Sequence, residues 1–192
     1  QANDVVASKT AFGLLTGKPV EDVTLKIIPS KYLPQTTEKE LDELELPKGQ
    51  IGEIIVSGDA VNKTYIDNPK AIAENKISTE KTVWHKTGDS GYLDENGQLF
   101  LTGRVSQIIH HNEKTYYPFV IENSLKNIEG ITAGTLLLIK DKLILALCVT
   151  AGFSEQSLSS FDYDEIQYFN SFPFDPRHHS KIDYQKLTEV LG

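Results

Sequence analysis

Short runs of apolar residues, some alternating with polar ones and some continuous, recur along the chain and predict strands. Val23–Ile28 (VTLKII) alternates, and Gln50–Ser57 (QIGEIIVS) contains an apolar run of strand length. Ile131–Ile139 and Leu143–Thr150 are apolar almost throughout and are separated by the polar Lys140-Asp141-Lys142. We therefore expect these last two strands to pair across a tight turn.

The densest β signal lies between residues 82 and 103, and a further β segment follows it. Asn96-Gly97 is a strong hairpin-turn dipeptide, and it separates Gly91–Asp94 from Gln98–Thr102. A second hairpin is expected over Val105–Tyr117, with its turn near Asn112. This part of the chain is therefore predicted to hold two successive hairpins.

Helical signals are confined to short segments. Pro118 suits the first turn of a helix, and apolar residues follow it with helical spacing to about Asn127. Further helices are expected over residues 67–75, 163–170 and 184–191, and residues 1–20 and 151–162 are expected to be irregular. The acidic stretch Glu38–Glu45 predicts a solvated loop or a short helix.

The pattern changes near Arg104. Before it the chain is mostly β, and after it strands alternate with helices. We therefore expect an α+β protein with a β-rich region over residues 1–104 and a small α+β domain over residues 105–192.

Composition and charge narrow the range of functions. The net charge of −8 disfavours a nucleic-acid binder, which would more often present a basic face. No run approaches the roughly 18 apolar residues of a membrane span, and the first residues do not form a signal peptide. The single Cys148 excludes an internal disulfide and a cysteine-based zinc site. A cytoplasmic location is expected.

The start of the chain points to a longer protein. The sequence opens on Gln1 and contains no methionine. We therefore expect a fragment of a larger parent, whether it was produced deliberately or by proteolysis, and we consider the function of the parent and of the fragment separately.

A series of spaced motifs carries the candidate chemistry. Trp84-x-x-Thr87-Gly88-Asp89 is followed by Gly91, Asp94, Gly97 and Gly103-Arg104. Gly52-Glu53-Ile54-x-Val56-x-Gly58 precedes this series and Pro118-x-x-Ile121-Glu122 follows it. In order and spacing the chain resembles the superfamily of adenylate-forming enzymes, which comprises acyl-CoA synthetases, peptide-synthetase adenylation domains and luciferases. The resemblance runs from about Gly17 to Leu187.

The resemblance implies both an architecture and an activity. Residues 1–104 would be the β-rich tail of the family's large N-terminal domain, and residues 105–192 its mobile C-terminal lid domain. The parent would be an ATP-dependent, AMP-forming ligase that activates a carboxylic acid as an acyl-adenylate. ATP, Mg²⁺ and the carboxylic acid would be required, and CoA is a possible acyl acceptor.

The resemblance also implies roles for four residues. Asp89 would accept hydrogen bonds from the ribose hydroxyls of the nucleotide, for which a carboxylate is suited, and Arg104 would contact the ribose side. Ser106 takes the place of the family's hinge residue, which is usually Asp or Lys. Lys181 takes the place of the catalytic lysine, whose ammonium can bridge the attacking carboxylate and the α-phosphate.

Two departures from the family bear on the second half-reaction. Many thioester-forming members carry Gly-Gly in the hairpin after the hinge, near the path of the pantetheine arm, where this chain has Asn112-Glu113. Ser180 stands where members usually have Gly before the lysine. The Arg-His-x-x-Lys-Ile run is similar to that of olefin β-lactone synthetases. A thiol-independent member, or a non-catalytic interaction module derived from the family, therefore remains as an alternative.

Other parts of the family's active site do not match residues of this chain. Its phosphate loop, its Mg²⁺ motif and its acyl pocket would all lie upstream of Gln1, so the isolated fragment is expected to be inactive and the acid cannot be named. Gly13–Pro19 resembles a P-loop only superficially, because Pro19 stands where Ser or Thr must bind Mg²⁺. The pairs His110-His111 and His178-His179 lack an acidic partner cluster, and we expect no metal site there.

Overall fold

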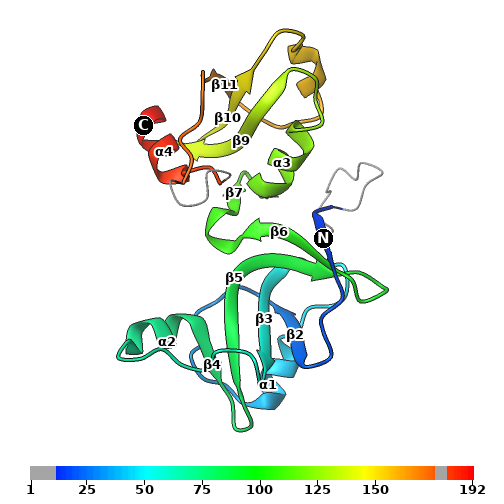
Figure 1. Ribbon diagram of the computed structural model, residues 1–192, viewed down its shortest axis with the longest axis vertical. Helices are drawn as coiled ribbons and strands as arrows, with labels where there is room; N and C mark the ends of the chain where they lie inside the picture. Colours follow the sequence, from blue (N-terminus) through cyan, green and yellow to red (C-terminus); the bar gives the residue numbers. More distant parts are fainter. Residues whose placement is uncertain (1–11, 176–180) are drawn as a thin grey trace. The chain divides into compact units, whose positions relative to one another are not determined.

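The computed structural model describes residues 12–175 and 181–192. It divides into two compact units, Gln1–Gln107 and Ile108–Gly192, which Figure 1 shows coloured along the sequence. This division lies three residues beyond the boundary predicted at Arg104. Within the described residues both units combine a sheet with short helices, and the predicted α+β class is confirmed.

The first unit is built on one antiparallel sheet. Its strands lie in the order β1-β6-β5-β3-β2, and β4 pairs with β5. Two short helices, α1 and α2, connect strands of this sheet. The bounds are β1 Leu14–Gly17, β2 Val23–Ile28, α1 Glu38–Glu43, β3 Gly52–Gly58, α2 Pro69–Asn75, β4 Lys76–Ser78, β5 Val83–Leu93 and β6 Leu99–Arg104.

The acidic stretch of the first unit forms a helix because its start is capped. The Thr37 side chain accepts from the backbone N–H of Glu40, and the Glu40 carboxylate accepts from the N–H of Thr37. The helix places Leu41 in a core with Ile55, Trp84 and other apolar residues of the sheet. Of the two alternatives left open for this stretch, the short helix is correct.

The second unit begins with a small hairpin and continues with a three-stranded sheet. In this sheet β10 pairs antiparallel with β9 and parallel with β11. The bounds are β7 Ile109–His111, β8 Lys114–Tyr116, α3 Pro118–Leu125, β9 Ile131–Ile139, β10 Lys142–Val149, β11 Glu165–Tyr168 and α4 Tyr184–Leu191, with single 3₁₀ turns at Val105–Gln107 (in the first unit) and Glu155–Leu158.

Both faces of the β9–β10 pair are buried, which explains why these strands are apolar almost throughout. Leu136 and Leu145 face a core that includes Leu125 of α3. Leu137 and its neighbours on the other face pack with Leu187 of α4. Strand residues alternate between faces, so the sheet lies between α3 and α4 as a middle layer (Figure 1).

Two predictions of local structure are wrong. Residues 163–170 contain the strand β11 rather than a helix, because the edge of β10 offers backbone partners from Ile144 to Leu147. The Asp164 carboxylate also accepts from the N–H of Leu143 at 2.7 Å at the start of this strand. Within the stretch expected to be irregular, Leu14–Gly17 forms β1, which pairs with β6. In both cases a neighbouring strand edge decides the structure.

Candidate functional site

The Thr-Gly-Asp motif forms a bulge in β5. Glu53 pairs with Ser90 and Ile55 pairs with Lys86, so the three residues between them on β5 stand opposite Ile54 alone. Bulges of this kind redirect side chains and are frequent beside active sites.

Thr87 and Gly88 stabilise this bulge. The Thr87 hydroxyl donates to the Ile54 carbonyl at 2.9 Å and accepts from the N–H of Asp89 at 3.1 Å. Gly88 has a φ of 73°, a left-handed conformation that favours glycine. The motif's threonine and glycine therefore fix the backbone that carries Asp89.

Asp89 and Arg104 are direct cross-strand partners on β5 and β6. The Arg104 Nε atom lies 3.2 Å from the Asp89 Oδ1 atom, and its Nη1 donates to the Thr87 carbonyl at 3.1 Å. Both side chains are partly exposed, at 34% for Asp89 and 51% for Arg104. A carboxylate has further lone pairs when one oxygen is engaged, so Asp89 can still accept from hydroxyl groups of a ligand.

Ser106 lies close to the junction of the two units. It is exposed, in the single 3₁₀ turn Val105–Gln107, and the division between the units follows Gln107. Its role as a hinge stays a prediction.

Lys181 is exposed and is the first described residue after the gap at 176–180. Its carbonyl accepts from the N–H of Asp175 at 2.8 Å, and the next residue, Ile182, bridges to Phe174. Asp183 then caps α4 by accepting from the N–H of Lys186 at 3.1 Å. The neighbouring Ser180 and the pair His178-His179 lie outside the described residues.

The hairpin between β7 and β8 turns at Asn112-Glu113, as predicted. Both residues have positive φ, 48° and 63°, which is the backbone that a two-residue turn of this type requires and that glycine adopts most easily. The turn thus keeps a glycine-like conformation while it carries two side chains, both exposed.

Comparison with known proteins reveals relatives along most of the chain. YdaB of Bacillus subtilis (strain 168), an acyl-CoA ligase by name, is 33% identical over 172 residues, which are 82% of this chain and 31% of that protein. The acyl-CoA ligase sidI of Aspergillus fumigatus is 30% identical over 86% of this chain and 31% of its own length. The 2-succinylbenzoate–CoA ligase of Enterococcus faecalis is 32% identical over 74% of this chain and 26% of its own length. No family model matches the chain.

The chain belongs to the adenylate-forming superfamily. It spans about a third of the length of the curated relatives that it matches, with 31% for the first two. Solved structures agree on the fold. ATP-bound MatB of Rhodopseudomonas palustris has a TM-score of 0.71 at 19% identity, over 92% of this chain and 35% of its own. The amide bond synthetase McbA of Marinactinospora thermotolerans has a TM-score of 0.71 at 23% identity, over 93% and 36%.

The second unit contains a polar network that the sequence did not predict. Glu122 of α3, Thr135 of β9 and Tyr184 of α4 are joined by hydrogen bonds. Burial raises the pKa of the Glu122 carboxyl, although its bonds from Tyr184 and Thr135 act in the opposite direction. Burial also raises the pKa of the Tyr184 phenol, so this group stays a neutral donor. Glu122 belongs to a quoted motif, but nothing in the sequence marked Tyr184 as its partner.

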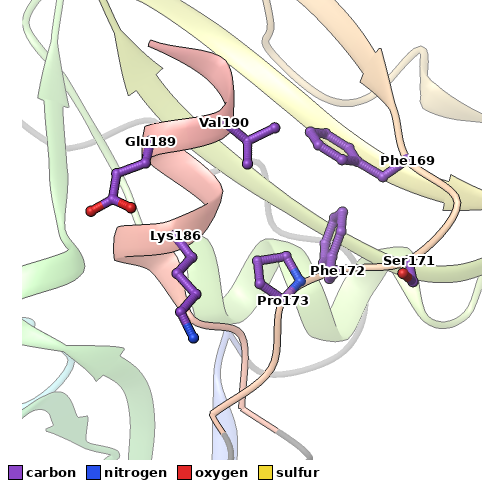
Figure 2. A pocket seen from close by; sticks show the side chains of 7 residues that line it. All are labelled: Phe169, Ser171, Phe172, Pro173, Lys186, Glu189 and Val190. Carbon is purple, nitrogen blue, oxygen red and sulfur yellow. The ribbon is translucent and has the colours of Figure 1, made fainter.

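A shallow pocket of about 610 Å³ lies beside α4. Figure 2 shows Val190 of the helix directed toward Phe169, with Phe172 and Pro173 beside them. The rings of Phe169 and Phe172 meet edge to face, with centroids 5.5 Å apart. The pocket is mainly apolar, and Pro173 in its lining directly precedes Phe174, which bridges to Ile182.

Two kinds of feature are absent from residues 12–175 and 181–192. Among these residues no helix combines the length and apolar character that crossing a membrane demands. In the same ranges no three His, Cys, Asp or Glu side chains are grouped so that they could hold a metal ion.

Proposed function

We propose that the full-length protein is an ATP-dependent, AMP-forming acid–CoA ligase. The observation that carries this proposal is the Thr-Gly-Asp bulge, which places Asp89 beside Arg104, in a chain whose relatives are named acyl-CoA ligases. Asp89 would accept from the two ribose hydroxyls, and Arg104 would orient the Asp89 carboxylate and contact the ribose side.

In the first step a carboxylate oxygen of the acid attacks the α-phosphorus of ATP. The bond to the bridging oxygen breaks, and pyrophosphate leaves with that electron pair. Two anions must approach one another, so Lys181, with its flexible stem and compact ammonium, would offset the charge that develops in the transition state.

In the second step the thiol of CoA attacks the acyl carbon. The thiol gives up its proton, the acyl–oxygen bond breaks and AMP leaves. The thiol-independent alternative has in its favour the side chains at Asn112-Glu113, whereas the names of the relatives favour CoA. We therefore propose CoA as the acceptor.

We also propose that Mg²⁺ accompanies the ATP. Among the described residues no cluster of carboxylates or imidazoles is arranged for a metal. The ion would therefore be held by the phosphates and by groups outside the described residues.

A cytoplasmic location is proposed as well. Cys148 is buried, and burial raises the pKa of its thiol, which keeps it in the protonated, unreactive form. A single free thiol is typical of a reducing compartment. Cell fractionation with an antibody against the chain tests this location.

Acid-dependent ATP–pyrophosphate exchange by the full-length protein tests the proposed function. The acids to assay are acetate to octanoate and 2-succinylbenzoate, the last from the name of one relative. We expect exchange with at least one acid and CoA-dependent release of AMP with the same acid. AMP release at a rate that does not depend on CoA would favour the thiol-independent alternative. Failure of the protein to bind ATP would favour a non-catalytic module.

Lys181→Ala provides the mutational test. We expect a loss of roughly 100- to 1,000-fold in the exchange rate with little change in ATP binding. Lys186→Ala is the matched control, because it removes the same charge five residues later from a side chain that is 59% exposed. Equal rates for the two variants would remove Lys181 from the mechanism.

A further inference from the structure

Three polar side chains meet between the layers of the second unit. The Thr135 hydroxyl lies 2.9 Å from the Glu122 Oε1 atom and 3.0 Å from the Tyr184 hydroxyl. The Tyr184 hydroxyl donates to the same Glu122 oxygen. Thr135 is fully buried and lies on β9, the strand between α3 and α4. The network thus ties both helices to the sheet through a single carboxylate oxygen.

The network is connected by a short stretch of backbone to Lys181. Tyr184 is the first residue of α4 and lies three residues after Lys181. Between them, Ile182 bridges to Phe174, and the N–H of Asp183 donates to the Pro173 carbonyl at 2.8 Å. Two residues therefore separate Tyr184 from Lys181, and both are bonded to the segment Pro173-Phe174.

We propose that the network of Glu122, Thr135 and Tyr184 positions Lys181 for adenylation. The inference rests on the proposed function, in which Lys181 is the catalytic residue and these three are positioning residues. An exposed lysine must be held to within a fraction of an ångström, because a misplacement of about 1 Å can cost on the order of 100-fold in rate. Buried hydrogen bonds to a carboxylate are strong enough to hold the start of α4 in this way.

Alternative roles for the network fit its geometry less well. Thr135 is buried, Glu122 and Tyr184 are half-buried, and side-chain hydrogen bonds join the three to one another. A direct part in binding a substrate would compete with these bonds, because both hydroxyls and the Glu122 Oε1 atom already engage one another. A positioning role needs only the covalent link from Tyr184 to Lys181.

The test compares Tyr184→Phe with Tyr168→Phe in the full-length protein. Tyr168 also donates to a carboxylate, Glu155, at 2.5 Å, but it lies on β11 and is 48% exposed. We expect Tyr184→Phe to lower the adenylation rate about 10- to 100-fold with KM for ATP unchanged. Tyr168→Phe should leave the rate as it is. Thioester formation from supplied acyl-adenylate should be unaffected in both variants, whereas a general loss of folding would lower it.

A measurement that does not depend on catalysis tests the positioning alone. Hydrogen exchange at the amide of Asp183 reports on the backbone next to Lys181. We expect Tyr184→Phe to speed this exchange about fivefold, as the loss of one hydrogen bond would, and Tyr168→Phe to leave it unchanged. Unchanged exchange and an unchanged adenylation rate in Tyr184→Phe would overturn the proposal.

Two further variants separate this inference from the proposed function. In a Lys181→Ala background, Tyr184→Phe should add no further loss of adenylation, because its effect passes through Lys181. A full additional loss would overturn the positioning role. If Lys181→Ala alone leaves adenylation intact, the proposed role of Lys181 fails, and faster exchange in Tyr184→Phe would still show that the network holds this backbone.

Glu122→Gln, which keeps an acceptor oxygen, should retain most of the adenylation rate.

Discussion

The two units hold their candidate residues in different ways. In the first unit Asp89 and Arg104 lie on paired strands, face each other in register and contact each other directly. In the second unit the side chain of Lys181 is exposed, and its backbone is held by a hydrogen bond from Asp175 and by the neighbouring bridge between Phe174 and Ile182. A sheet ladder thus fixes the first pair, and for the second site we have proposed support from the network of Glu122, Thr135 and Tyr184.

This difference indicates which substitutions can displace each site. A position fixed by a hydrogen-bond ladder is supported by many backbone bonds, so few single substitutions elsewhere can move it. A position on a loop depends on a few distant side chains, so substitutions that never touch a ligand can displace it.

The largest effect is expected at Leu187, the buried residue of α4. Leu187 is fully buried against β9 and β10. Leu187→Ala should lower the free energy of unfolding of the second unit by about 2–5 kcal/mol, because it leaves a cavity. Urea unfolding of the 192-residue chain, followed by amide exchange in each unit, measures this loss.

Val190→Ala is the control for this prediction. Val190 lies on the same helix and is 70% exposed, so its truncation should change stability by no more than about 0.5 kcal/mol. Similar losses of unfolding free energy in the two variants would mean that α4 is not packed on the sheet as described. The support proposed for Lys181 would then be contradicted as well.

The next largest effect concerns the paired residues of the first unit. Asp89→Ala in the full-length protein should weaken ATP binding roughly 10- to 100-fold, because it removes charge-assisted hydrogen bonds, and should change the rate at saturating ATP much less. Isothermal titration with ATP measures the affinity. Asp162→Ala removes a comparable exposed carboxylate, paired with Lys114 at 2.8 Å, and should leave the affinity for ATP unchanged. An ATP affinity equal in both variants would contradict the ribose role.

The same contrast explains what the sequence could predict. The apolar pattern of Leu143–Val149 predicts a buried strand, and the spacing of the Thr87-Gly88-Asp89 motif marks a candidate site, because each signal is local. Glu122 and Tyr184 are 62 residues apart, and no local pattern indicates that they meet. The strand β11 was missed for the same reason, since its structure depends on the free edge of β10.

A smaller effect is expected from the titration of Glu122. Burial raises the pKa of this carboxyl above its usual 4.5, so the folded protein holds the proton more tightly than the unfolded chain does. The stability that this group contributes is fully present below about pH 4.5, the usual pKa of the carboxyl. It is lost as the pH rises through the higher pKa of Glu122 in the folded protein. Glu122→Gln should remove this dependence while keeping an acceptor for Tyr184 and Thr135. Urea unfolding from pH 4 to 8 measures how the free energy of unfolding depends on pH.

Tyr184→Phe sharpens the prediction for Glu122. The hydrogen bond from Tyr184 lowers the pKa of Glu122, so its removal should move the loss of stability to higher pH. A shift in the opposite direction would show that Tyr184 does not stabilise the ionised carboxylate, and the network would lose its central contact.

The smallest effect on stability is expected at the turn that carries Glu113. Glu113 has a φ of 63° and Asp141, in the turn between β9 and β10, has a φ of 64°. Glu113→Gly and Asp141→Gly therefore remove the same charge from matched backbones, and each should change the free energy of unfolding by no more than about 1 kcal/mol. Only Glu113→Gly should speed CoA-dependent AMP release severalfold, with adenylation unchanged, because the resemblance to thioester-forming members places that turn near the pantetheine arm. An equal gain from Asp141→Gly would assign the effect to net charge rather than to the path of the thiol.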